Sequence, residues 1–132
     1  RSLDGYVPWF LNDIEKIVDA LAVNDRHVVL VTLPGLFVPD EEPSPRALEI
    51  GHLPQFTENP YFLAKMVVKY NESLRDLARK KHSQLIDLAA WSRTAVQPRD
   101  RYFFDSLHLY DEGQELIGAY MSEQLRNLIP AK

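Results

Sequence analysis

The sequence predicts an α/β protein in which a small parallel sheet is flanked by helices. Apolar residues recur at helical spacing over three segments, 8–22, 60–81 and 111–129. Two strand-like runs, 28–33 and 84–88, lie between these segments, and the first is apolar without polar alternation. Such a run is typical of a strand covered on both faces, and helices that alternate with strands predict parallel pairing through crossover connections.

The first helix and the first strand precede a proline-rich stretch. The helix is predicted from Pro8 to about Ala22, and Asn24-Asp25 is expected to break it. Its buried face is predicted to contain Phe10, Ile14, Ile17, Val18 and Leu21. The strand 28–33 follows, and Pro34-Gly35 ends it.

The stretch from Gly35 to Asn59 is predicted to be one long loop. It contains four prolines, and a connection of about two dozen residues is longer than compact domains normally use. The loop is therefore expected to be functional, like a lid, or mobile, with a short helical turn near 46–50. We expect it to overhang a site at the carboxyl end of the strand, where open α/β sheets place their ligands.

The second half of the chain contains the best-defined helix signals. Asn59 is predicted to be an N-cap with Pro60 as the first helical residue. This helix ends in the cationic run 79–81, which suits the negative end of the helix dipole and favours a solvated helix end over a binding patch. The strand 84–88 and one or two helical turns over 89–95 come next.

The last helix is predicted from Asp111 to about Ile129. Asp111 is expected to cap it, with Gln114 at the capping-box partner position. Its buried face is predicted to contain Leu116, Ile117, Tyr120, Met121, Leu125 and Leu128. No repeat or linker divides the sequence, so residues 1–132 are predicted to form a single domain.

Composition excludes several classes of function. With 45% hydrophobic and 26% charged residues, the chain resembles an ordinary soluble globular protein, and its compartment is left open. The absence of cysteine excludes disulfides, thiolate chemistry and cysteine-ligated zinc. A net charge of −4 argues against nucleic acid as a partner, and no apolar run approaches the length of a membrane span or a signal core.

Asp105 and His108 are the candidate catalytic residues. They stand three positions apart on a turn that leads into the last helix, so both side chains can point into one pocket, as an acid-oriented general base requires. A structural histidine beside a helix-start aspartate is the alternative reading. His27, His52 and His82 show no paired metal-ligand spacing, so no metal site is expected.

Other side chains with a potential role are assigned to the fold. Trp9 and Trp91 are predicted to be core or interface aromatics. Thr32 and Ser106 are free hydroxyls in this interpretation, and Ser106 is expected to form a turn because it is too close in sequence to His108 to be its triad partner.

The blocks occur in a recognisable order: Thr32-Leu33-Pro34 at a strand end, Tyr70-Asn71-Glu72-Ser73-Leu74 in a helix, Leu85-Ile86-Asp87-Leu88 in a strand, and Phe104-Asp105-Ser106-Leu107-His108 followed by Gly113. This order resembles the carboxyl-terminal half of the SGNH (GDSL-type) hydrolase family. The resemblance implies a partial flavodoxin-like three-layer fold, an ester hydrolase (esterase, lipase or deacetylase) acting on a small acyl ester, and no metal or organic cofactor. It implies that Asp105 orients the imidazole, that His108 is the general base and that Gly113 is the glycine of the last block.

The sequence departs from the family upstream of this block. The Gly-Asp-Ser motif with the nucleophilic serine is absent, as are the glycine and asparagine blocks of the oxyanion hole, and no glycine has a serine within the next two positions. Asn24-Asp25 is not the asparagine block, because Ala22 stands where that block has glycine and a strand follows. We therefore expect the 132-residue chain alone to be inactive.

The resemblance also places the strand 28–33 fourth in the family's sheet, which leaves its upstream edge unpaired. An apolar edge strand invites association, so we expect a homodimer that covers this edge or a piece of a longer protein. Alternatively, Tyr102-Phe103-Phe104 folds over and pairs there. Two functional hypotheses remain: a hydrolase whose serine comes from another segment or chain, and an inactive module that binds a protein or small ligand through the loop 35–59 or the strand edge.

Overall fold

The computed structural model describes residues 3–23 and 26–129, so the break predicted at Asn24-Asp25 lies outside the described residues. Within these ranges it contains six helices and two strands. In chain order they are α1 (Leu11–Ala22), β1 (Val29–Val31), α2 (Pro45–Ile50), α3 (Pro60–Lys81), β2 (Gln84–Ile86), α4 (Leu88–Ala95), α5 (Arg99–Tyr102) and α6 (Asp111–Leu128).

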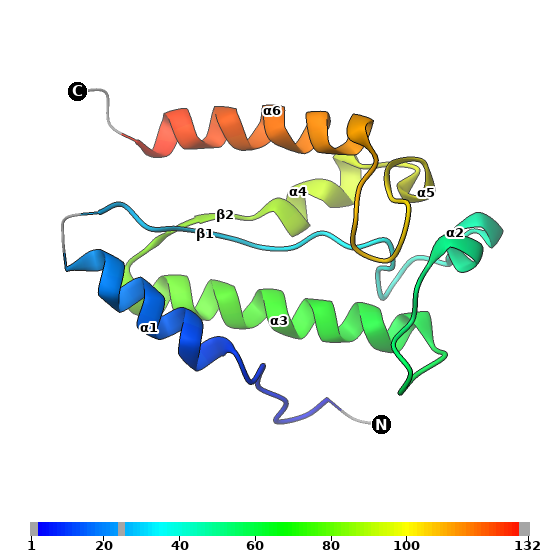
Figure 1. Cartoon of the computed structure of the whole chain (residues 1–132), viewed down its shortest axis with the longest axis horizontal. Coiled ribbons are helices and arrows are strands. Elements are labelled where there is room, and N and C mark those ends of the chain that lie inside the picture. The colour runs from blue at the N-terminus through cyan, green and yellow to red at the C-terminus, as the bar shows by residue number, and fades with distance from the viewer. Residues whose placement is uncertain (1–2, 24–25, 130–132) are drawn as a thin grey trace.

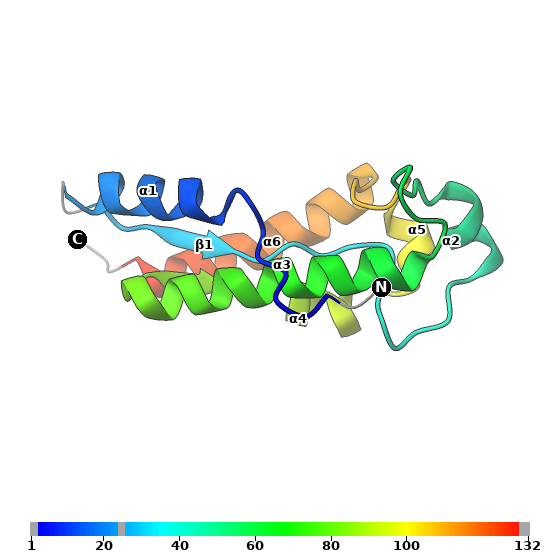
Figure 2. The same ribbon diagram turned by 90° about the horizontal axis from the view of Figure 1, so that it is seen from below.

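The strands β1 and β2 form a two-stranded parallel sheet, in register from Val29 opposite Gln84 to Val31 opposite Ile86. Helix α3 contacts both strands and also α1, whereas α6 contacts β2 (Figure 1). Figures 1 and 2 show α1 and α3 side by side on one face of the sheet and α6 across the other face. The predicted mixed α/β fold with parallel strands between helices is confirmed.

Two of the helix predictions are confirmed, whereas the first helix begins at Leu11 and Ile17, predicted on its buried face, is 57% exposed. Asn59 caps α3 by accepting a hydrogen bond from the Tyr61 N–H at 2.9 Å, and Pro60 is the first helical residue. The helical turn expected near 46–50 is α2, which the Ser44 hydroxyl caps. The cationic end of α3 is partly solvated as predicted, but Lys81 is largely covered because it pairs with Glu15 and Asp19 of α1.

Four local predictions need correction. Both strands are three residues long; just beyond them the Thr32 N–H donates to the Ile86 carbonyl at 3.2 Å, and the side chains of Thr32 and Asp87 bond to each other. The helix α5 was not expected. Asp111 is the first helical residue of α6, and Tyr110 stands at the N-cap without a side-chain cap. Phe103 forms an antiparallel bridge with Leu109, so the 102–104 segment does not pair with the edge of β1.

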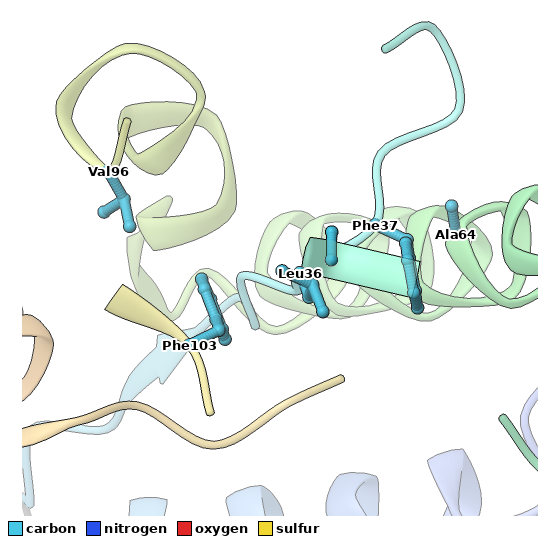
Figure 3. Close-up of a cluster of buried hydrophobic side chains, with 6 residues drawn as sticks. Leu36, Phe37, Ala64, Val96 and Phe103 are labelled. Carbon is cyan, nitrogen blue, oxygen red and sulfur yellow. The ribbon is translucent and has the colours of Figure 1, made fainter. Parts of the chain in front are cut away.

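The main core lies at the end of the molecule toward which the strands run. Figure 3 shows this cluster, which comprises Leu36, Phe37, Ala47, Ala64, Val96 and Phe103. Three of these residues come from the stretch 35–59, so the predicted loop is anchored in the core by its beginning and by α2. The stretch is therefore fixed to the core at these points, and its expected role over a site at the carboxyl end of the strand stays a prediction.

The predicted aromatic residues have different environments. Trp91 of α4 stacks on Tyr120 of α6, with ring centroids 4.2 Å apart, and this pair joins the two helices. Trp9 is 80% exposed and is not a core residue.

Within the described ranges no further strand pairs with the outer edge of β1, or with that of β2. Among the same residues, no helix combines the length and apolarity needed to cross a bilayer.

Candidate active site

The loop that carries Asp105 and His108 is the tip of a short antiparallel hairpin. Phe103 bridges Leu109, the Phe104 N–H donates to the His108 carbonyl at 3.0 Å, and the Tyr110 N–H donates to the Tyr102 carbonyl at 2.8 Å. Phe103 is fully buried, which fixes the base of the hairpin in the core. The two candidate residues are thus held by backbone pairing on both sides of the turn.

Ser106 ties this loop to the carboxyl end of the sheet. Its carbonyl accepts a hydrogen bond from the Leu36 N–H at 3.0 Å, five residues beyond the end of β1. Its hydroxyl donates to the His52 carbonyl at 2.6 Å, and the residue is buried. Ser106 therefore belongs to a turn, as expected, but its hydroxyl is engaged and is not free for chemistry.

Asp105 and His108 meet as the sequence predicted. Oδ2 of Asp105 lies 2.7 Å from Nδ1 of His108. Because an ionised carboxylate only accepts hydrogen bonds, Nδ1 carries the proton that it donates to Asp105. The neutral ring then has its lone pair on Nε2, which is the form of histidine that abstracts a proton.

The second carboxylate oxygen of Asp105 fixes the orientation of the group. Oδ1 accepts hydrogen bonds from the backbone N–H groups of Leu107 at 2.8 Å and His108 at 2.7 Å. Partial burial acts to raise the pKa of Asp105, but the hydrogen bonds from these N–H groups and from the His108 ring outweigh it and lower the pKa below its ordinary value. The carboxylate is therefore ionised at neutral pH, as an acid that orients an imidazole must be.

An aromatic residue that sequence reasoning missed contacts the imidazole. The ring of Phe104 stacks on that of His108 with centroids 5.7 Å apart and planes 17° apart. Phe104 also packs against Tyr110, at 5.5 Å. The signal was present in the run of aromatic residues before Asp105, but nothing in it identified the partner. The His108 side chain is 70% exposed, so this contact and Asp105 leave most of the ring open to solvent.

Gly113 has a physical role at the start of α6. A Cβ on this buried residue would lie 2.8 Å from Cδ2 of Leu109 and 3.0 Å from the carbonyl oxygen of Tyr102. Both groups belong to the hairpin that carries the candidate residues. The missing side chain allows α6 to pack directly against this hairpin.

A polar cluster formed by Thr32, Arg75 and Asp87 lies just beyond the carboxyl ends of β1 and β2. Arg75 binds both carboxylate oxygens of Asp87 at 2.8 Å, and the Thr32 hydroxyl donates to Oδ1 at 2.8 Å. The bonds from Arg75 are the main cause of the lowered pKa of Asp87, with burial opposing them. Thr32 is fully buried and bonded, so it is not the free hydroxyl that the sequence suggested.

Asn71 supports the same strand end from α3. Its side chain accepts a hydrogen bond from the Leu33 N–H and donates one to the Leu33 carbonyl, both at 2.8 Å. It thereby bonds both backbone groups of Leu33, two residues beyond β1, as a paired strand would. Asn71 is 3% exposed, so these two bonds satisfy polar groups that water does not reach.

The remaining histidines stand apart from this loop. His27, His52 and His82 are exposed residues on separate segments, although the His52 backbone carbonyl binds Ser106. Within residues 3–23 and 26–129, no group of histidine, aspartate and glutamate side chains is arranged to hold a metal ion.

No family model, curated protein or solved structure matches this chain.

Proposed function

We propose that this chain is the carboxyl-terminal part of an SGNH-type ester hydrolase and that Asp105 and His108 are the acid and base of a Ser-His-Asp triad. The observation that carries the proposal is the 2.7 Å contact between Asp105 and Nδ1 of His108. Support also comes from the place of this pair, on a loop bonded to the segment after β1, and from the close packing at Gly113. In this proposal the sheet is the end of a larger flavodoxin-like sheet, with β1 as its fourth strand.

The residues of this chain would act on the proton of a serine hydroxyl. Nε2 of His108 takes that proton as the serine oxygen attacks the ester carbonyl, and it returns the proton to the departing alcohol. Asp105 keeps Nδ1 protonated and stabilises the imidazolium that forms. Water then hydrolyses the acyl-serine by the same proton transfers and releases a carboxylate.

The serine and the oxyanion donors come from another segment or chain in this proposal. Among the described residues near the loop, the hydroxyls of Ser106 and Thr32 are already bonded. This observation also favours a second candidate, a binding module that has kept the scaffold without the chemistry. The hydrolase candidate predicts that this chain, together with the segment or chain that supplies the serine, hydrolyses esters through His108. The binding module predicts no such hydrolysis.

The test measures hydrolysis of short-chain acyl esters by the full gene product and by the 132-residue chain. We expect turnover and labelling by a serine-directed phosphonate only in the full product, and a loss of about 10⁴-fold in kcat for Asp105→Asn. His108→Ala should lose at least as much. His52→Ala is the matched control, because the histidine at this position contributes only its backbone carbonyl.

Turnover that survives His108→Ala would reject the proposal. A full product that neither hydrolyses esters nor reacts with the phosphonate would favour the binding module. Turnover by the 132-residue chain that disappears with His108→Ala would support His108 as the base. It would refute a serine supplied from outside this chain.

A further inference from the structure

A pocket of about 280 Å³ lies along the segment 33–39, and no residue of the Asp105 and His108 loop lines it. Its walls come from that segment, from α3 and from the first turns of α4. This volume lies just below the range of about 300–1,000 Å³ that is usual for ligand pockets, so the pocket has room only for a small ligand.

The charged residues that line this pocket are all arginines. Arg75, Arg93 and Arg99 face it, and no aspartate or glutamate is among the described residues of its wall. The carboxylates that pair with Arg75 and Arg93 lie outside the wall: Asp87 at 2.8 Å from Arg75, and Asp40 and Glu41 at 2.8 and 3.2 Å from Arg93. A ligand in the pocket therefore contacts the arginines directly, whereas the carboxylates that pair with them do not line the pocket.

Arg99 is the least compensated of the three cations. Its residue is 6% exposed, and its guanidinium donates to neutral groups, the Gly35 carbonyl at 2.7 Å and the Ser92 carbonyl at 3.2 Å. The nearest carboxylate oxygen belongs to Glu41, at 4.0 Å from Nε. Burial accordingly lowers the pKa of Arg99, because a charge held away from water by dipoles alone is destabilised.

Two of the arginines each have a buried N–H donor that lacks an acceptor. Nε of Arg93 and Nε of Arg99 are shielded from solvent and have no hydrogen-bond partner. An anion in the pocket would stabilise both guanidiniums electrostatically, since the attraction between opposite charges is strong where water is excluded.

A neighbouring pocket gives a contrast within the same protein. It has a volume of about 200 Å³, and its wall contains Glu41, Glu42 and Asp100 against the single cation Arg99. An anion would be repelled there. The excess of arginine in the first pocket therefore does not follow from the general charge of this end of the molecule, in a chain whose net charge is −4.

Apart from Gly35 and the polar residues Asn71 and Ser92, the rest of the lining is apolar. It comprises Leu33, Pro34, Phe37, Val38, Pro39, Ala64, Val67, Val68, Ala89 and Ala90. We propose that this pocket binds a short aliphatic carboxylate, with the carboxylate among Arg75, Arg93 and Arg99 and the hydrocarbon against α3 and the segment 33–39. Arginine provides paired donors for a carboxylate, and the aliphatic wall favours a hydrocarbon tail over a more hydrated anion.

This proposal is independent of ester hydrolysis. It rests on a pocket that contains neither Asp105 nor His108, and its readout is binding alone. Its failure would leave the proposed triad untouched, and a failure of the triad would leave this pocket as it is.

The test is a nuclear magnetic resonance titration of the ¹⁵N-labelled chain with hexanoate and with 1-hexanol, its uncharged counterpart. We expect hexanoate to shift the amide signals of Val67, Ala89 and Ala90, and 1-hexanol to bind about tenfold more weakly because it lacks the charge-assisted bonds. Arg93→Gln should weaken hexanoate by about tenfold. Arg101→Gln removes an arginine that is also paired with a carboxylate, that of Glu112, but lies outside the pocket, and it should leave binding unchanged.

A second variant keeps the proposal testable if Arg93→Gln disturbs the fold. Ala90→Leu fills the pocket with a side chain and leaves every arginine in place, and it should abolish the hexanoate shifts. Equal binding of hexanoate and 1-hexanol, shifts confined to residues outside the pocket, or hexanoate binding unchanged in Ala90→Leu would overturn the proposal.

Discussion

Replacing Gly113 by alanine tests how α6 packs against the hairpin that carries the candidate site. The new Cβ would lie 2.8 Å from Cδ2 of Leu109, 3.0 Å from the Tyr102 carbonyl oxygen and 3.2 Å from Cβ of Leu109. The Leu109 methyl can rotate away. The Tyr102 carbonyl cannot move freely, because it accepts the 2.8 Å hydrogen bond from the Tyr110 N–H.

Two opposing effects set the size of the change. Overpacking by one methyl group costs about 1–3 kcal/mol, and alanine gains up to about 1 kcal/mol over glycine within a helix. The net result expected for Gly113→Ala is a loss of about 1 kcal/mol in the free energy of unfolding. Gly118 of the same helix is the matched control, because a Cβ there meets nothing within 4 Å. Gly118→Ala should gain about 1 kcal/mol.

The assay is chemical and thermal unfolding followed by far-ultraviolet circular dichroism. The two variants should differ by about 2 kcal/mol, or by about 8 °C in Tm for a domain of this size. A Gly113→Ala protein that is as stable as Gly118→Ala would refute the close packing and, with it, the reason given for glycine at this position.

Two further predictions concern the polar groups at the strand ends. Asn71→Leu should lower the free energy of unfolding, measured by urea titration, by about 2–4 kcal/mol, because it leaves the Leu33 N–H and carbonyl without partners. Asn127→Leu, at an exposed position on α6, is the control and should change the free energy of unfolding little. Asp87→Asn should lower stability at neutral pH, and the difference from the native protein should close below about pH 4. The sign follows from the lowered pKa of Asp87, whose stabilising effect is present above its ordinary pKa and is lost as the pH falls through the value in the folded protein. Urea midpoints at about pH 7, about pH 5 and about pH 3 would measure this closing gap, and a gap that stays constant with pH would contradict it.

The parts of the fold that sequence predicts well are those set by local chemistry. Asn59 and Pro60 start α3 because an amide cap and a fixed φ act within one turn. The acid and imidazole of Asp105 and His108 stand three positions apart, so their contact also depends on one turn. The cap of α6 was misplaced because the Tyr110 N–H pairs with the Tyr102 carbonyl, and this pairing keeps Tyr110 extended just before the helix.

The interactions that sequence did not predict join distant residues. Asn71 lies 38 positions from Leu33, and Arg99 lies 64 positions from Gly35. A hint existed for Asn71, which interrupts an apolar stripe between Val67 and Leu74, but spacing along one helix does not identify a partner on a strand. The proposed carboxylate pocket was missed for the same reason, since its arginines come from three different helices.

The parallel pairing of β1 with β2 has a consequence for synthesis of the protein. The strand ends are linked by Thr32 and Asp87, which are 55 positions apart, and the whole of α3 lies between them. During translation, β1 leaves the ribosome well before the strand that pairs with it, and non-local pairing of this kind forms slowly. Nascent chains arrested before Gln84 would carry β1 with both backbone edges free, and we expect them to be bound by chaperones that the finished chain does not need.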